Sequence, residues 1–190
     1  MDRKVDVIMQ LTKGFEQAAC IMALLATQNR GIPLSSHVIH TRVSSSQTYL
    51  KKIMRKLVVG GLITSASGNS GGFSLAREPE DITLLQIVSA VEGEIHTYPN
   101  NGLLDLVFSD FKPIATEGNS AINAAFDAAD QLWRQALDKV TIYDLLCQTL
   151  GTVDVPKVDW NKLQLSPSEQ ATAIIDKTVS YTHLTLPTIA

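Results

Sequence analysis

The chain has little of what marks a secreted or membrane protein. Only two of its 190 residues are cysteine, Cys20 and Cys147, and they lie far apart in the sequence. Two distant thiols exclude a disulfide framework and suit a reducing compartment. The longest apolar run ends at Ala26 and is too short to cross a bilayer, and the N-terminal residues lack the pattern of a secretory signal. We therefore expect a cytoplasmic protein without a membrane segment.

Charged residues are also few, at 18% of the chain, and their distribution is uneven. Residues 1–77 contain ten Lys or Arg and three Asp or Glu, a net charge of +7, whereas the remaining residues carry a net charge of −10. Hydrophobic residues make up 45%, which is the balance of a folded globular chain. The basic first part indicates a polyanionic partner that the acidic second part does not bind.

Two helices are expected near the start of the chain. Apolar residues three and four positions apart predict a helix over 12–28. Gly31 and Pro33 then interrupt the pattern, because glycine favours helix ends and proline cannot continue a helix. A second, short helix is expected over 35–42, with a serine as its N-cap.

A third helix, over 47–59, follows a turn of serines that ends in Ser46, a good N-cap. One face of this helix is apolar and carries Tyr49, Leu50, Ile53, Met54 and Leu57. The other face is polar and basic and carries Gln47, Thr48, Lys51, Lys52, Arg55 and Lys56. Two short helices joined by a tight turn, with the second basic on its outer face, indicate a helix-turn-helix.

The pattern changes after the third helix. Residues 62–66 and 72–76 are expected to form two short strands around a glycine-rich tip at 67–71, followed by a helix over 84–91. A hairpin directly after such a helix is typical of a wing. The predicted fold class is therefore mainly α with a small β-hairpin wing, that is, a winged helix-turn-helix with a long C-terminal dimerisation helix.

The most regular apolar pattern lies in the second half of the chain. Its members alternate in spacing between four and three residues: Ile122, Phe126, Ala129, Trp133, Ala136, Val140, Tyr143 and Cys147. This heptad pattern predicts one helix over 121–150 that packs against another helix. We expect that helix to belong to a second copy of the chain, and packing against its own domain is the alternative.

These patterns divide the chain into a DNA-binding domain at 1–93, a connector at 94–120, and a dimerisation helix at 121–150. Residues 151–178 are polar and weakly patterned, and we expect a flexible tail there. Residues 179–190 resemble a translated cloning run-on and are excluded from functional reasoning.

Other candidate sites are weak. The glycines around 68–72 lack the Lys-Ser/Thr ending and following helix of a phosphate-binding loop. His37 and His40 have no visible third metal ligand, and His96 stands alone in the connector. No catalytic pattern is present, so we expect neither an enzyme nor a metal site. Cys20 lies in an apolar helix and is expected to be buried and inert.

Several runs in order resemble the Rrf2 family of bacterial winged-helix regulators. They are Pro33-Leu34-Ser35-Ser36, Tyr49-Leu50-Lys51-Lys52-Ile53-Met54, Gly61-Leu62-Ile63, Gly71-Gly72-Phe73-Ser74-Leu75-Ala76-Arg77, Ile82-Thr83-Leu84 and Ala90-Val91-Glu92-Gly93. The resemblance implies a transcription regulator, in the family's usual role of repressor, that binds a palindromic operator as a homodimer. It also implies that the long later helix makes the dimer.

Two departures from the family pattern matter. Members that hold an iron–sulfur cluster have three cysteines in the connector, and residues 94–119 contain none here, so we expect no cofactor. Ser67 stands where some members place an arginine near the wing tip, which shifts DNA contact to the third helix.

The expected partners are double-stranded DNA, a second copy, and a small-molecule effector bound between the winged domain and the dimer helix. The residues expected to bind DNA are Arg42, Ser45, Ser46, Gln47, Thr48, Lys51, Lys52, Arg55, Asn69 and Ser70. Those expected at the dimer interface are Ile122, Phe126, Ala129, Trp133, Ala136, Val140 and Tyr143. The alternative from another class is a winged-helix protein–protein adaptor that does not bind DNA.

Overall fold

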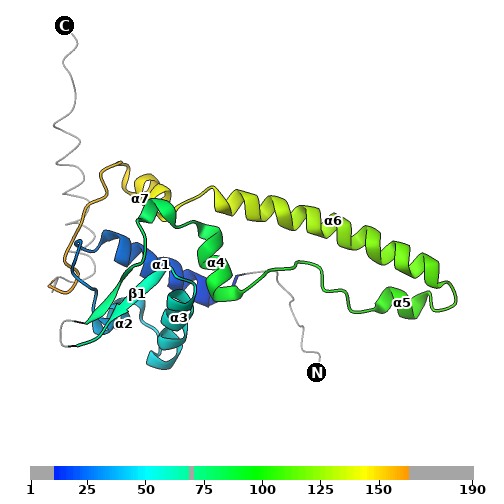
Figure 1. Ribbon diagram of the computed structural model, residues 1–190, viewed down its shortest axis with the longest axis horizontal. Coiled ribbons are helices and arrows are strands. Elements are labelled where there is room, and N and C mark those ends of the chain that lie inside the picture. The colour runs from blue at the N-terminus through cyan, green and yellow to red at the C-terminus, as the bar shows by residue number, and fades with distance from the viewer. Residues whose placement is uncertain (1–10, 69–70, 163–190) are drawn as a thin grey trace, which may run out of the picture.

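The computed structural model describes residues 11–68 and 71–162, which form a body at one end and a long helical arm (Figure 1). Three helices begin the body: α1 (Lys13–Thr27), α2 (Ser36–Val43) and α3 (Gln47–Val59). A hairpin of β1 (Ile63–Ala66) and β2 (Gly72–Leu75) follows, then a 3-10 turn at Pro79–Asp81 and α4 (Leu84–Glu92). The predicted fold class, mostly helical with a two-stranded wing, is confirmed.

The core of the body forms around α1. Its inward face carries Ala18, Ile21, Met22 and Leu25, each 5% exposed or less. Onto this face pack apolar side chains from every other part of the body, including Leu34, Ile39, Ile53, Leu57, Leu62, Ile82 and Ile87. Burial of this apolar surface is the main source of the body's stability.

The wing is joined to the start of the helix-turn-helix. The two strands pair antiparallel with Ile63 opposite Leu75 and Ala66 opposite Gly72. Leu34 adds a bridge, because it exchanges two backbone hydrogen bonds of 2.9 Å with Phe73. A side chain at Gly72 would collide with the backbone carbonyl of Leu34, so this close approach requires glycine.

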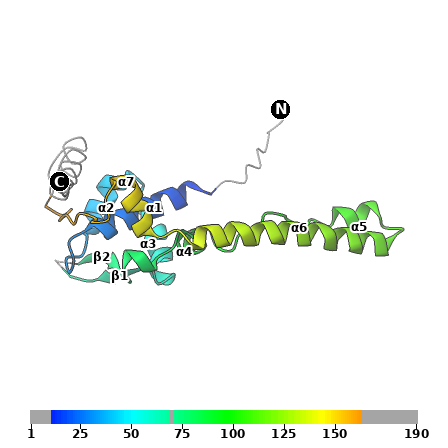
Figure 2. The ribbon, with the colours of Figure 1, turned by 90° about the horizontal axis from the view of Figure 1, so that it is seen from above.

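The arm consists of α5 (Leu103–Val107) and α6 (Lys112–Asp138) and extends away from the body (Figure 2). At 1.5 Å per residue, α6 is about 40 Å long. The segment between α4 and α5 lies alongside α6. Tyr98 stacks on Phe126 with ring centroids 5.1 Å apart, and Thr97 donates its hydroxyl and backbone N–H to Asp130 at 2.7 and 3.1 Å.

The single helix predicted over 121–150 is wrong, because the structure has two helices, α6 and α7 (Ile142–Leu150). The break has a physical cause. The Val140 carbonyl accepts from the N–H of Leu84, and the N–H of Ile142 donates to the carbonyl of Ile82. Thr141 then caps α7 through a reciprocal pair of bonds with Asp144. Tyr143 and Cys147 therefore lie on a different helix from Phe126.

Two other expectations about the second half are corrected. The connector at 94–120 does not end where the long helix begins, since it contains α5 and the first residues of α6. Residues 151–162 are not a free tail, because Val155 and Trp160 are buried and Val158 pairs with the end of α1. Residues 163–178 of the predicted tail and the run-on at 179–190 lie outside the described residues. Among the described helices, none is both long and apolar enough to span a membrane.

Candidate nucleic-acid interface

The turn between α2 and α3 is built by serines. Ser35 caps α2 by accepting a hydrogen bond from the N–H of Val38 at 3.3 Å. Ser44 ends that helix in the left-handed region, with φ of 49°, which reverses the chain. Ser46 then caps α3 by accepting from the N–H of Tyr49 at 3.3 Å. The predicted helix-turn-helix therefore forms with the predicted cap at the start of α3.

The outer face of α3 is the basic surface of the body. Leu50, Ile53, Met54 and Leu57 are buried toward the core, as the spacing predicts. The polar side chains that remain exposed at the surface are Ser46, Gln47, Thr48, Lys51, Lys52 and Arg55, while Ser45 is half-buried. Lys56 does not belong to this set, although it was expected on the same polar face, because its ammonium donates to the backbone carbonyl of Val91.

A groove of about 560 Å³ separates α3 from the wing. Lys51 and Arg55 stand on its helix side, and Ser65, Ala66 and Gly68 on its hairpin side. Ser67 is exposed near the tip, whereas Asn69 and Ser70, both predicted to bind DNA, lie outside the described residues.

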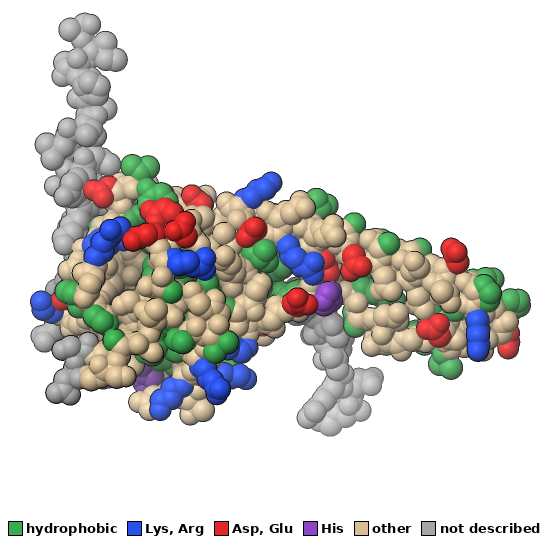
Figure 3. Space-filling view, in the orientation of Figure 1, with side chains coloured by type: hydrophobic (Ala, Val, Ile, Leu, Met, Phe, Trp, Pro, Cys, Tyr) green, Lys and Arg blue, Asp and Glu red, His purple; other side chains and the backbone are tan. Residues whose placement is uncertain are grey.

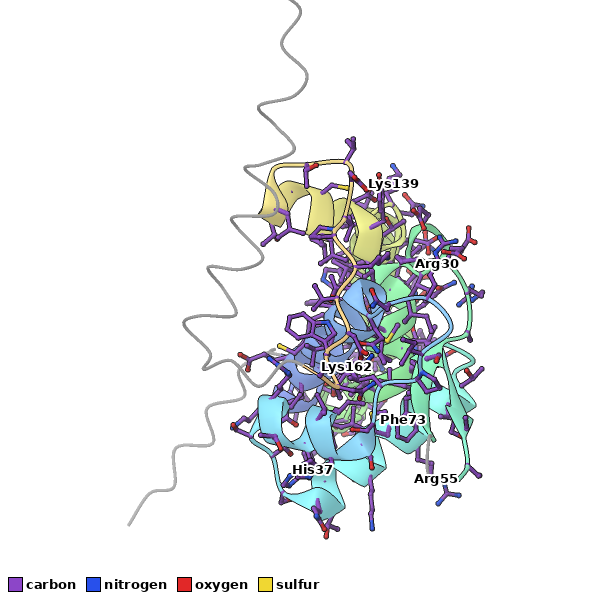
Figure 4. The ribbon with its side chains drawn as sticks, turned by 90° about the vertical axis from the view of Figure 1, so that its left-hand side faces the viewer. Arg30, His37, Arg55, Phe73, Lys139 and Lys162 are labelled. Carbon is purple, nitrogen blue, oxygen red and sulfur yellow. The ribbon has the colours of Figure 1, made fainter. Side chains whose placement is uncertain are left out.

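Charge is unevenly distributed over the body. On the face shown in Figure 3, Lys and Arg side chains gather without Asp or Glu along the edge where α3 lies, whereas near α7 Asp and Glu side chains lie among several Lys and Arg. Arg55 and His37 lie at one end and Lys139 at the other (Figure 4). A surface of one sign on one edge attracts an oppositely charged polymer to that edge.

Arg42 differs from the exposed cations of α3, because it is partly buried and contacts an aromatic ring. It is half-buried near the end of α2, and its guanidinium carbon lies 4.4 Å from the centre of the Trp160 ring. Burial lowers the pKa of this guanidinium. This cation–π contact joins the helix-turn-helix to the segment after α7.

A second cavity, of about 480 Å³, lies beside Arg42. Its wall is mainly apolar, with Ala23 and Leu24 from α1, Leu146 and Leu150 from α7, and Trp160. Sequence reasoning missed this cavity, because Trp160 falls in a segment with no periodic pattern. A lone tryptophan in a polar stretch was the available signal, since such large side chains are seldom left in water.

Gln17 and Cys20 also line this cavity. Gln17 is only 6% exposed, and its Oε1 has no hydrogen-bond partner among the described residues. Cys20 is exposed, so the expectation of a buried thiol was wrong. The reason is rotational: Cys20 lies on the face of α1 that borders the cavity, next to the face that enters the core.

The residues predicted to form the dimer interface lie in several different environments. Phe126 is partly covered by Tyr98, and Trp133 borders a hollow lined by Leu85 and Val88 of α4. The hydroxyl of Tyr143 donates to the carbonyl of Val153 at 2.6 Å. Ala129 and Ala136 are exposed, and Ile122 and Val140 are half-buried. Part of this set therefore packs within its own chain, which was the alternative left open.

One group of potential metal ligands occurs in the described residues: His96, Asp127 and Asp130, with ligand atoms within 4.8 Å of one another. Both oxygens of Asp130 already accept hydrogen bonds from Thr97, and these bonds hold the pKa of that carboxyl below its ordinary value. The thiolates that an iron–sulfur cluster needs are not present in the connector. The residues present therefore do not fit the cluster held by some members of the resembled family.

The chain matches known proteins along most of its length. The sequence profile of the Rrf2 family, described as "Iron-dependent Transcriptional regulator", matches residues 11–148. A Bacillus subtilis (strain 168) protein named "Putative HTH-type transcriptional regulator YwgB" is 31% identical over 80% of this chain and 93% of its own length. A Lactococcus lactis protein named "Putative HTH-type transcriptional regulator YffB" is 31% identical over 74% of this chain and 89% of its own.

Solved structures share the fold. T. potens IscR has a TM-score of 0.54 at 23% identity and aligns over 74% of this chain and 88% of its own. CymR, the global cysteine regulator of B. subtilis, has a TM-score of 0.52 at 23% identity, over 73% of this chain and 96% of its own. Because the family profile covers well over half of the sequence, the chain belongs to the Rrf2 family and is a helix-turn-helix transcriptional regulator that binds DNA.

Proposed function

We propose that the protein is a repressor that binds a palindromic operator as a homodimer, with α3 in the major groove of each half-site. The observation that carries this proposal is the exposed basic face of α3, which stands beside a wing. An α-helix fits the major groove, and the residues at its N-terminal end reach the base edges. We place the working protein in the cytoplasm, where such DNA is found.

Two groups of side chains divide the work of binding. Lys51, Lys52 and Arg55 are exposed cations that neutralise phosphates and release counterions, which favours every DNA sequence equally. Ser45, Gln47 and Thr48 lie at the start of α3 and bear the short polar groups that distinguish bases. Ser46 contributes through the cap that orients this end of the helix.

The arm supports the proposal of a homodimer. Its exposed apolar side chains include Leu103, Leu106, Val107, Phe111, Ile114 and Leu132, which are 56–72% exposed. A monomer rarely leaves so many large apolar groups in water on one arm, so a second copy is the occupant we assign to them. A two-fold dimer would present α3 twice, as two half-sites require.

The test begins with footprinting on the DNA upstream of the protein's own gene, and continues by fluorescence anisotropy at fixed salt. Lys51→Ala should weaken binding to all sequences and reduce the slope of log K against log salt by about 1. Lys139→Ala is the matched control, because Lys139 is an exposed lysine at the opposite end of the body.

Gln47→Ala tests base reading. It should relax discrimination at one position in each half-site by about 1–3 kcal/mol and leave the salt slope unchanged. Gln148→Ala, an exposed glutamine on α7, is the control. If neither Lys51→Ala nor Gln47→Ala changes operator affinity, α3 is not the recognition helix. If the purified protein ignores DNA even at low salt, the adaptor alternative takes its place.

A small-molecule effector completes the proposed function. The cavity beside α7 supports it, since the cavity lies between the winged body and the helix that continues from the arm. A ligand can shift operator affinity only if it binds one arrangement of these helices more tightly than another.

A further inference from the structure

We propose that the cavity between α1, the end of α2 and α7 is the effector site, and that it takes a small apolar molecule with one hydrogen-bond donor. The inference has two halves. The binding half, that the cavity holds such a ligand, stands on the geometry of the cavity. The regulatory half, that the ligand changes operator affinity, rests on the proposed function, so the two can fail separately.

The size and wall of the cavity define the apolar part of the ligand. About 480 Å³ lies within the range of sites that hold small organic molecules. The lining side chains Leu24, Val43, Leu146 and Leu150 offer only carbon to an occupant. The indole of Trp160 adds a flat apolar surface, while its N–H is already donated to the hydroxyl of Thr27 at 3.0 Å. The wall therefore selects an apolar, ring-sized body.

Gln17 defines the polar part of the ligand. It is buried in the cavity wall, and its Oε1 has no hydrogen-bond partner among the described residues. A buried acceptor without a partner costs free energy, and a donor that reaches it recovers that cost. Oε1 is closed to a water-sized atom in the ligand-free protein, so the amide of Gln17 must turn toward the cavity before a hydroxyl or N–H of the ligand can donate to it. The charged side chains Lys13 and Glu16 are exposed and stand at the rim, where water solvates them.

The position of the cavity gives it access to both functional parts of the protein. Arg42 and Val43 line it and lie directly before the turn that leads into α3. Leu146 and Leu150 line it from α7, and α7 follows directly after α6 of the arm (Figure 1). An occupant thus touches the helix-turn-helix and the continuation of the proposed dimer arm at the same time.

The test uses the full-length protein and two probes that differ in one donor, 1-naphthol and 1-methoxynaphthalene. Isothermal titration calorimetry should show 1-naphthol binding about tenfold more tightly, the value of one hydrogen bond to a buried acceptor. In Gln17→Leu the two affinities should become equal, while Gln148→Leu on α7 should keep the tenfold preference. Absence of binding, or a preference that survives Gln17→Leu, overturns the site.

A second measurement needs no change to the wall of the cavity. In Cys147→Ser, Cys20 is the single thiol of the chain, and it lines the cavity. Saturating 1-naphthol should slow the reaction of Cys20 with 5,5′-dithiobis(2-nitrobenzoate) several-fold, because the occupant covers it. An unchanged rate would mean that the probe binds elsewhere, which overturns the proposal even if Gln17→Leu fails to fold.

The regulatory half is tested on DNA. Saturating 1-naphthol should change operator affinity at least fivefold in the wild type, which is the lower end of typical allosteric coupling. The same addition should have a smaller effect in Gln17→Leu. Binding without any change in operator affinity overturns the regulatory half, whereas failure of the ligand-free protein to bind DNA would overturn the proposed function instead.

Discussion

The body and the arm use their hydrophobic residues in opposite ways. In the body, Leu34 and Leu57 are fully buried, whereas on the arm Leu106 and Leu132 are 72% and 68% exposed. The body therefore completes its own core, and the arm does not. Apolar surface contributes stability only when it leaves water, and the proposed second chain would let the arm make the contribution that the body obtains alone.

The largest expected effect is on the core of the body. Leu57→Ala should lower the free energy of unfolding by about 2–5 kcal/mol, because it opens a cavity beneath α3. Urea denaturation followed by circular dichroism measures this loss. Val59→Ala, at an 80% exposed position of the same helix, should change the free energy by less than about 0.5 kcal/mol. Equal effects at the two positions would contradict the assigned faces of α3.

The next effect should separate the arm from the body. Leu106→Glu places a charge on the apolar surface of the arm and should weaken the dimer more than tenfold, because pairing would then bury that charge. Sedimentation equilibrium at several micromolar concentrations measures the dissociation constant. The control is Val153→Glu, at a 79% exposed valine after α7. A dimer that tolerates Leu106→Glu would assemble through another surface.

A smaller effect is expected where the arm returns to the body. The hydroxyl of Thr141 accepts from the N–H of Asp144 at 3.0 Å and so caps α7. Thr141→Ala should cost about 1 kcal/mol of unfolding free energy, and Thr141→Ser should retain most of it, since serine also caps helices. If the alanine variant is as stable as the wild type, the cap does not maintain the break between α6 and α7.

The smallest effect concerns pH and the tie between the connector and the arm, by which we mean the two hydrogen bonds that Thr97 donates to Asp130. Hydrogen bonds from Thr97 lower the pKa of Asp130, so its carboxylate stabilises this tie above the ordinary pKa of 3.8. That stabilisation is lost as the pH falls through the lowered pKa of the folded state. Hydrogen exchange of the Thr97 amide should accordingly lose protection below about pH 3.8 in the wild type.

The matched variants for this last prediction are Asp130→Asn and Asp127→Asn. Asp130→Asn should leave the Thr97 amide less protected than in the wild type and make that protection independent of Asp130 titration, because one neutral amide oxygen replaces the two carboxylate oxygens that accept from Thr97. Asp127→Asn, at an exposed neighbouring carboxylate, should keep the wild-type profile. A profile that does not depend on Asp130 would assign the contact between the connector and α6 to the Tyr98–Phe126 stack alone.

Local patterns were enough to predict the body. The apolar face of α3, its Ser46 cap and the hairpin after it were each legible within a short window, because helix faces and caps depend on neighbours three or four residues away. The position of the wing tip along the chain could also be predicted, although Asn69 and Ser70 lie outside the described residues. The role of Lys56 could not be predicted, since its partner Val91 is distant in the chain.

The second half of the chain shows what such patterns miss. The heptad stripe continued across Val140, so it suggested one helix, yet the backbone there bonds to Ile82 and Leu84. The local signal that was available is the Thr141–Asp144 pair, which has the spacing of a capping box. Trp160 gave no periodic signal, because its contacts with Thr27 and Arg42 join residues more than a hundred positions apart.

By itself, the order of residues determined the winged body, its basic edge and the chain's family, since each depends on short-range spacing and composition. Only the tertiary structure decided where the long helix ends, which cations of α3 remain exposed, and that a cavity exists between α1 and α7. Those features arise where distant segments compete for the same hydrogen bonds and the same apolar surface. That competition is settled by packing in three dimensions, which no local window contains.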